Sequence, residues 1–153
     1  MYTHFFAAKK ATAADAAAMI KASMHVAFSG YSQAGYPKDV VQALCDRKMA
    51  EPDFTIRVTT SANLSWIDEK LAGSSLVSHR FPMVAHKSLS KAVNAAQVSY
   101  CEQQMHKIPR LLRSRCLGPI DVLVVEALGF DQEGALIPTN AIGMLDILME
   151  TAD

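Results

Sequence analysis

The residues with the clearest chemical potential lie in a glycine-containing stretch near the N-terminus. An apolar run at residues 25–28 is followed by Gly30, then by a second glycine, Gly35, and by Pro37. Glycine lets backbone N–H groups approach a ligand closely, and a helix that begins at Pro37 would add partial positive charge. Such a loop suits an anion or a carbonyl oxygen. A plain turn between a strand and a helix explains the same pattern, so both interpretations stay open.

Two further groups of polar side chains follow predicted strands. Glu126 ends the most apolar run of the chain, and ligands of open α/β sheets gather at the carboxyl ends of strands. Its carboxylate could act as a nucleophile or orient a ligand, or it could bond the backbone of a neighbouring loop. Ser61 and Asn63 also end a strand and offer a hydroxyl and an amide, with N-capping of the next helix as the alternative.

Other candidate chemistry is weaker. The five histidines have neither cysteines nor a second histidine at the spacing of a metal site. The arginines at positions 110, 113 and 115 could meet a phosphate, or they could form an ordinary solvated helix face.

Composition indicates one folded domain. Of the 153 residues, 50% are apolar, and 15 basic residues balance 15 acidic ones, so nothing points to nucleic acid or to a membrane surface. The three widely spaced cysteines indicate reduced thiols, and no apolar run is long enough for a membrane span. The N-terminus does not resemble a signal peptide, so we expect a cytoplasmic protein.

The elements that must position these residues alternate along the chain. We expect strands at residues 25–28, 54–60, 98–101, 120–127 and 135–138, and helices at 12–20, 37–48, 64–73, 88–94, 108–117 and 144–152. Residues 78–82 have an irregular pattern. The order predicts an α/β fold with a mainly parallel sheet. Because the strand at 120–127 is apolar on both faces, its residues 122–125 are predicted at or near the sheet centre.

The order of residues around the glycines is more specific than the pattern. FSGYSQAGYPK at residues 28–38 resembles the loop FSGFTPAGYPK of the acetyl-CoA hydrolase/succinate CoA-transferase branch of the class I coenzyme A transferases. DEKL at 68–71, RFP at 80–82, IDVLVVEA at 120–127 and IPTNAIG at 137–143 are similar to further segments of that family. The resemblance covers residues 11–153 and leaves residues 1–10 as an N-terminal arm.

The resemblance implies a fold and an activity. The fold would be the three-layer, open, mainly parallel sheet of the CoA-transferase (NagB/RpiA-like) type, incomplete at its C-terminal end. The complete protein would move CoA between an acyl-CoA and a carboxylate such as acetate or succinate, or hydrolyse acetyl-CoA. The route would be a glutamyl-CoA thioester whose glutamate lies outside this chain, so Glu126 is not that nucleophile.

The resemblance also implies partners and site residues. A CoA thioester would be the substrate, with no permanently bound cofactor, and a missing C-terminal domain or a second copy would be the partner. This chain alone would be inactive. The residues expected to bind substrate, none of them catalytic, are Gly30, Tyr31, Gly35, Ser61, Asn63, Glu126, Thr139 and Asn140.

Two departures from the family pattern support an alternative. TTSA at residues 59–62 replaces a common Thr-Gly-Ala-Ser, and EQQMH at 102–106 replaces Asp-x-His-Leu-Ser. Either the substrate pocket is altered, or the chain is a non-catalytic remnant or ligand-binding domain that keeps the fold. If the chain is a domain that lacks its last strands, we expect an exposed sheet edge and a tendency to self-associate, whereas a cooperatively unfolding monomer would favour an independent domain.

Overall fold

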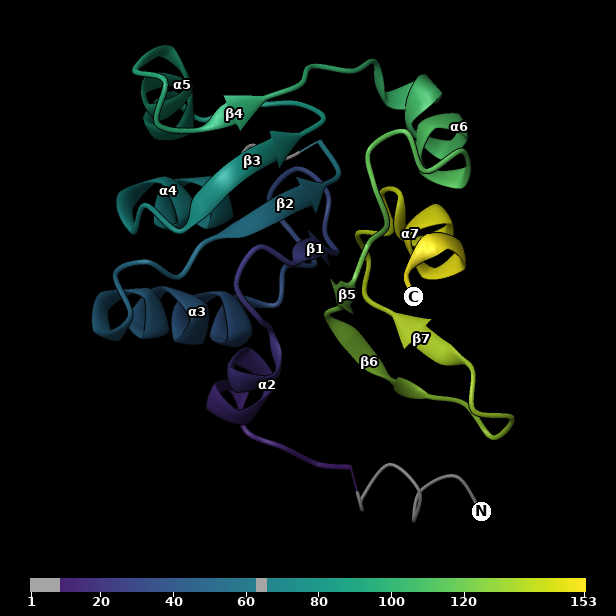
Figure 1. Ribbon diagram of the computed structural model, residues 1–153. Helices are drawn as coiled ribbons and strands as arrows, with labels where there is room; N and C mark the ends of the chain where they lie inside the picture. Colours follow the sequence, from purple (N-terminus) through teal and green to yellow (C-terminus); the bar gives the residue numbers. More distant parts are fainter. Residues whose placement is uncertain (1–8, 63–65) are drawn as a thin grey trace.

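A five-stranded parallel sheet forms the centre of the computed structural model, which describes residues 9–62 and 66–153 (Figure 1). Its strands are β1 (His25–Phe28), β2 (Ile56–Thr60), β3 (Val77–Phe81), β4 (Ser99–Tyr100) and β5 (Val122–Val124). The spatial order is β4-β3-β2-β1-β5, and every neighbouring pair is parallel. The predicted α/β fold with a mainly parallel sheet is therefore confirmed.

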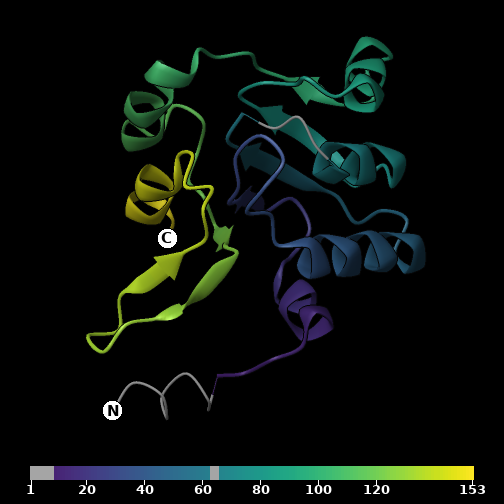
Figure 2. The same ribbon diagram turned by 180° about the vertical axis from the view of Figure 1, so that it is seen from behind.

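Helices cover both faces of the sheet (Figures 1 and 2). One side carries α3 (Lys38–Ala50), α4 (Trp66–Gly73) and α5 (Lys87–Asn94), with α2 (Ala13–Met19) packed against α3. The other side carries the short helix η1 (Met105–Lys107), α6 (Ile108–Arg113) and α7 (Leu145–Thr151). The architecture has three layers, and the predicted helices at 12–20, 37–48, 88–94 and 144–152 are confirmed to within a few residues.

Two apolar cores lie on opposite faces of β1. Val26 and Phe28 belong to the core beneath α3 and α4, whereas Ala27 belongs to the core that α6 and α7 close. All four residues of β1 are buried. A parallel strand between two helical layers is expected to be apolar on both faces, and β1 is the strand that meets this description.

The predicted central position of residues 122–125 is wrong, because β5 lies at the edge of the sheet and its residues are only half-buried. The apolar run predicted as one strand at 120–127 contains one short strand and the first residue of the next. It ends as β5 at Val124, and β6 (Ala127–Phe130) then pairs with β7 (Leu136–Pro138) in a separate antiparallel hairpin. An apolar run indicates burial, but it does not specify how many strands lie on either side.

The segment at residues 78–82 is also more regular than predicted, since most of it forms β3. Its charged residue, Arg80, is fully buried and pairs with Asp68 of α4, with Nε 3.2 Å from Oδ1. The same guanidinium donates to Thr60 Oγ1 at 2.5 Å and to the Phe81 carbonyl. Burial raises the pKa of Asp68, and the Arg80 charge opposes that rise.

Two predictions fall partly outside the described residues. The N-terminal arm at residues 1–10 is described only at positions 9 and 10, and the helix predicted at 64–73 is described from Trp66. Within the described part of the chain, no helix has the length and apolar character needed to cross a membrane.

The buried ion pair leads to a stability prediction. Asp68→Ala leaves the Arg80 charge buried without its partner, and such changes typically cost about 3–5 kcal/mol of unfolding free energy. Glu150→Ala is the matched control, because it removes a carboxylate from the exposed Arg113 pair and should barely change the denaturation midpoint. Equal urea midpoints for the two variants would contradict the role assigned to Arg80.

Candidate functional site

Two loops meet at the carboxyl ends of β1 and β2. One is the glycine loop, residues 29–37, and the other is the segment 139–144 that leads into α7. A Cβ atom built on Gly35 would lie 2.9 Å from Ala141 Cβ and 3.1 Å from Thr139 Oγ1. One built on Gly143 would overlap Ser61 Oγ and lie 3.1 Å from the Gly30 carbonyl oxygen. The fold thus brings Gly30, Gly35, Ser61 and Thr139 together.

The space beside Gly30 is filled by the chain itself. Gly30 has a φ of 111°, and the Tyr36 ring packs where its side chain would be. Tyr36 is 2% exposed, and its hydroxyl donates to the Ser32 carbonyl at 2.8 Å. Sequence reasoning missed Tyr36 and named Tyr31, which is 50% exposed at the surface of the loop. An aromatic residue six positions after a glycine carries no local signal of this contact.

Ser29 was also missed, although it joins three parts of the site. Its hydroxyl donates to the Gly35 carbonyl and accepts from the backbone N–H of Glu126, both at 2.8 Å. Its own N–H donates to the Val124 carbonyl at 2.9 Å. Glu126 therefore lies beside the glycine loop, half-buried. The available signal was a serine directly after a buried strand and before a glycine.

The remaining predicted site residues differ in exposure. Ser61 is 1% exposed, and its hydroxyl accepts from the Met144 N–H at 2.8 Å. Asn140 is exposed beside half-buried Thr139, and Asn63 lies outside the described residues. Tyr31 and Asn140 are therefore the exposed predicted side chains around the cluster, and Glu126 and Thr139 are half-buried.

A buried polar cluster lies beneath the sheet's second layer of helices. His25 Nδ1 lies 2.9 Å from the Pro119 carbonyl oxygen, and Nε2 lies 2.7 Å from Thr59 Oγ1. Burial, with the nearby Arg57 charge as a second cause, lowers the pKa of His25 from 6.5 to about 4. The ring is therefore neutral at pH 7 and serves as a hydrogen-bonded link between β1, β2 and the connection into β5.

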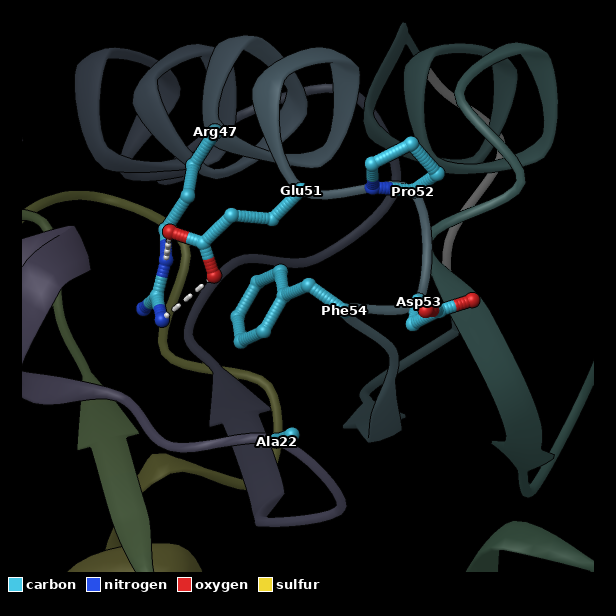
Figure 3. Close-up of a pocket in the computed structure, with 6 residues that line it drawn as sticks. All are labelled: Ala22, Arg47, Glu51, Pro52, Asp53 and Phe54. Carbon is cyan, nitrogen blue, oxygen red and sulfur yellow. Dashed lines mark hydrogen bonds and ion pairs between the residues drawn. The ribbon is translucent and has the colours of Figure 1, made fainter.

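A pocket at the opposite end of the sheet has a structural explanation (Figure 3). Arg47 Nε lies 3.0 Å from Glu51 Oε1, and its guanidinium lies 4.0 Å from the centroid of the Phe54 ring. The same group donates to the carbonyls of Ala17 and Ile20 at the end of α2. The Arg47 guanidinium therefore has its partners within the chain, and it connects the end of α2 to α3 and to the segment before β2.

Two of the three arginines predicted as a possible phosphate-binding face form ion pairs within the chain, and Arg110 is exposed. Arg113 forms two bonds with Glu150 of α7, at 2.8 and 2.7 Å, and Arg115 forms two with Asp153, at 3.0 and 2.6 Å. These ion pairs hold α6 to the end of the chain. Among residues 9–62 and 66–153, no group of three or more His, Cys, Asp or Glu side chains could hold a metal ion.

Comparison with protein families gives a match across almost the whole chain. The model described as "Acetyl-CoA hydrolase/transferase N-terminal domain" matches residues 2–153.

Individual relatives agree with this match. The chain is 29% identical to a succinyl-CoA:acetate CoA-transferase from Clostridium kluyveri over 95% of its length. It is 32% identical to a propanoyl-CoA:succinate CoA transferase from Escherichia coli over 86% of its length. It spans only 27% and 28% of these two relatives. Among solved structures, RipA from Yersinia pestis superposes with a TM-score of 0.63 at 19% identity, covering 82% of this chain and 30% of RipA.

The neutral histidine predicts a pH dependence of stability. Between pH 6.5 and 4 the unfolded chain binds a proton at residue 25 that the folded chain does not, so stability falls as the pH falls. The loss reaches about 3 kcal/mol near pH 4 and is absent above pH 6.5 or so. Urea unfolding at several pH values should give a steeper slope for wild type than for His25→Asn. Gln104→Ala, which changes an exposed side chain that does not titrate, should keep the wild-type slope, and identical slopes in all three proteins would refute the assignment.

The packing around Gly35 predicts a second effect. Gly35→Ala forces a side chain into a φ of 76° and against Ala141, which should cost about 1–2 kcal/mol of stability. Gly73→Ala is the control, because the added Cβ atom would meet nothing within 4 Å apart from its chain neighbours and the backbone of its own helix. Thermal unfolding should separate the two variants, and a Gly35→Ala protein as stable as wild type would show that the loops can move apart freely.

Proposed function

The chain belongs to the acetyl-CoA hydrolase/transferase family as its N-terminal domain, and from this premise we propose that it forms one wall of a site for CoA thioesters. The complete protein would transfer CoA between an acyl-CoA and a carboxylate such as acetate or succinate, or hydrolyse acetyl-CoA. The named activities of the Clostridium and Escherichia relatives support this reaction class.

The observation that carries the proposal is the convergence of residues from distant segments. Gly30 and Gly35 follow β1, Ser61 follows β2, and Thr139 precedes α7, yet all of them meet in one cluster. The cluster lies at the carboxyl ends of parallel strands, which is where open α/β sheets bind ligands. This shared location of four of the residues predicted to bind substrate supports the proposal.

The chemistry would proceed through a glutamate supplied from outside this chain. That carboxylate would attack the thioester carbonyl and expel CoA as a thiolate, leaving a mixed anhydride. The thiolate would then attack the glutamyl carbonyl, so that the donor acyl group leaves as a carboxylate carrying one glutamate oxygen and a glutamyl-CoA thioester remains. An acceptor carboxylate then takes the CoA and regenerates the glutamate, or water cleaves the thioester. Glu126 is not proposed for this role, because the family resemblance assigns the nucleophilic glutamate to a segment outside this chain.

The proposed contacts follow from exposure. Tyr31 and Asn140 are exposed at the surface of the cluster and would touch the substrate, whereas Gly30, Gly35 and Ser61 are buried and would shape the surface beneath. Thr139 and Glu126 are half-buried at its rim. Asn63 stays a proposed contact by its position in the sequence after β2.

The proposed partner is the second domain of the same protein family. The hairpin of β6 and β7 exposes Leu128 to 77%, Phe130 to 44% and Ile137 to 41% of their surfaces. A two-stranded hairpin with apolar residues in solvent is stabilised by packing against further structure. We propose that a C-terminal domain covers it in the complete cytoplasmic protein, with a second copy of this chain as the alternative.

A non-catalytic domain is the second candidate, and one observation favours it. The serine at position 61 stands where the sequence departs from the family pattern, and its hydroxyl is buried and bonded to the Met144 N–H. A ligand-binding domain or remnant of the family would keep this packing without contributing to turnover.

Binding and turnover measurements on the full 153-residue chain separate these candidates. We expect acetyl-CoA to bind by calorimetry without turnover in the presence of acetate or succinate, because the proposed nucleophile lies elsewhere. Tyr31→Ala should weaken binding at least about fivefold, roughly 1 kcal/mol. Met49→Ala is the control, because it truncates an exposed apolar side chain on α3, away from the cluster, and it should not change the affinity for acetyl-CoA.

Each other outcome has a definite meaning. Saturable turnover by this chain alone would refute the assignment of the nucleophile to another domain. The absence of thioester binding would favour the remnant, and an equal effect of both substitutions would remove Tyr31 from the site.

A further inference from the structure

Two buried serines hold the loops of the candidate site together. Ser29 is 3% exposed and Ser61 is 1% exposed, and each follows the last residue of a neighbouring strand, β1 or β2. Neither hydroxyl points to solvent. The role of each must therefore be found in what it bonds within the chain.

The Ser29 hydroxyl uses both of its hydrogen-bonding capacities. It donates to the Gly35 carbonyl at the far end of the glycine loop, and it accepts from the Glu126 N–H at the end of β5. These two groups are 91 positions apart in the sequence, and Ser29 fixes the distance between them. The glycine loop is thereby tied to the edge of the sheet.

The Ser61 hydroxyl ties the second loop to the first. It accepts from the Met144 N–H, and it packs against Gly143, which lies next to the Gly30 carbonyl. The adjoining backbone contributes a further bond, from the Ser32 N–H to the Ala62 carbonyl at 2.8 Å. The glycine loop is therefore bonded to the Ser29 hydroxyl through the Gly35 carbonyl, and to the residues after β2 through the Ser32 N–H.

We propose that Ser29 and Ser61 are positioning residues that preset the glycine loop and the 139–144 segment as one binding surface. The identity of the ligand, a CoA thioester, rests on the proposed function. The positioning itself rests on the hydrogen bonds. Without either hydroxyl, a buried N–H loses its acceptor, and the cost of the unpaired group favours a loop that opens to water.

Amide hydrogen exchange followed by NMR tests the positioning. Ser29→Ala should accelerate exchange about tenfold or more at Glu126, and also at Tyr31 and Ser32, whose own bonds do not involve Ser29. Ser61→Ala should do the same at Met144 and Ser32. Ser29→Thr, which retains a hydroxyl, should return exchange to within about threefold of wild type.

The matched control is Ser78→Ala. Ser78 lies on β3 and donates to the Ile56 carbonyl at 3.0 Å, at the amino end of the sheet. Its loss should lower global stability as much as the other substitutions without changing exchange in the two loops. The proposal would be overturned if Ser29→Ala accelerated exchange uniformly through the sheet. It would also be overturned if Ser78→Ala accelerated exchange in the two loops as much as Ser29→Ala does.

Acetyl-CoA affinity supplies the functional readout. Ser29→Ala and Ser61→Ala should each weaken binding about tenfold, whereas Ser78→Ala should stay within about twofold of wild type. Faster loop exchange with unchanged affinity would overturn positioning, because the loops would then be ordered for stability alone. If wild type binds no thioester, the proposed function fails, and the exchange measurements still decide whether the serines couple the loops.

Discussion

The buried charge of Arg80 constrains everything built at the carboxyl end of the sheet. A guanidinium without solvent must have its donors satisfied, and here the partners come from α4, the end of β2 and β3 itself. The end of β2 is thereby fixed at Thr60, whose hydroxyl also donates to the Ser61 carbonyl. Since Ser61 bonds Met144, the position of the loop before α7 depends in turn on this ion pair.

Local signals were sufficient where the determinants are local. The buried strand at 25–28 and the helix after Pro37 follow from neighbouring residues, and the helix predicted at 12–20 is present as α2. Partners distant in sequence were not predictable in the same way. The segment that became β3 looked irregular because Arg80 is polar, and its neutralising carboxylate lies twelve residues earlier on another element.

The same distinction applies to the site. The sequence analysis named Gly30, Gly35, Ser61 and Thr139 as site residues, and the fold brings these four together. It did not specify why the glycines are needed. In the structure their missing side chains leave room for Tyr36 and Ala141, so the requirement comes from packing within the chain, which no pattern of adjacent residues contains.

The pairing of residues 152 and 153 with Ile120 has a practical consequence for anyone who labels this 153-residue chain when it is expressed alone. Ala152 pairs in parallel with Ile120, and the Asp153 N–H donates to the Ile120 carbonyl at 3.0 Å, beside the open edge of β5 (Figure 1). An affinity tag or fluorophore fused directly to Asp153 would begin as an extended segment along that edge and compete for its backbone bonds. A glycine-serine spacer would let the fused group leave the sheet without disturbing it.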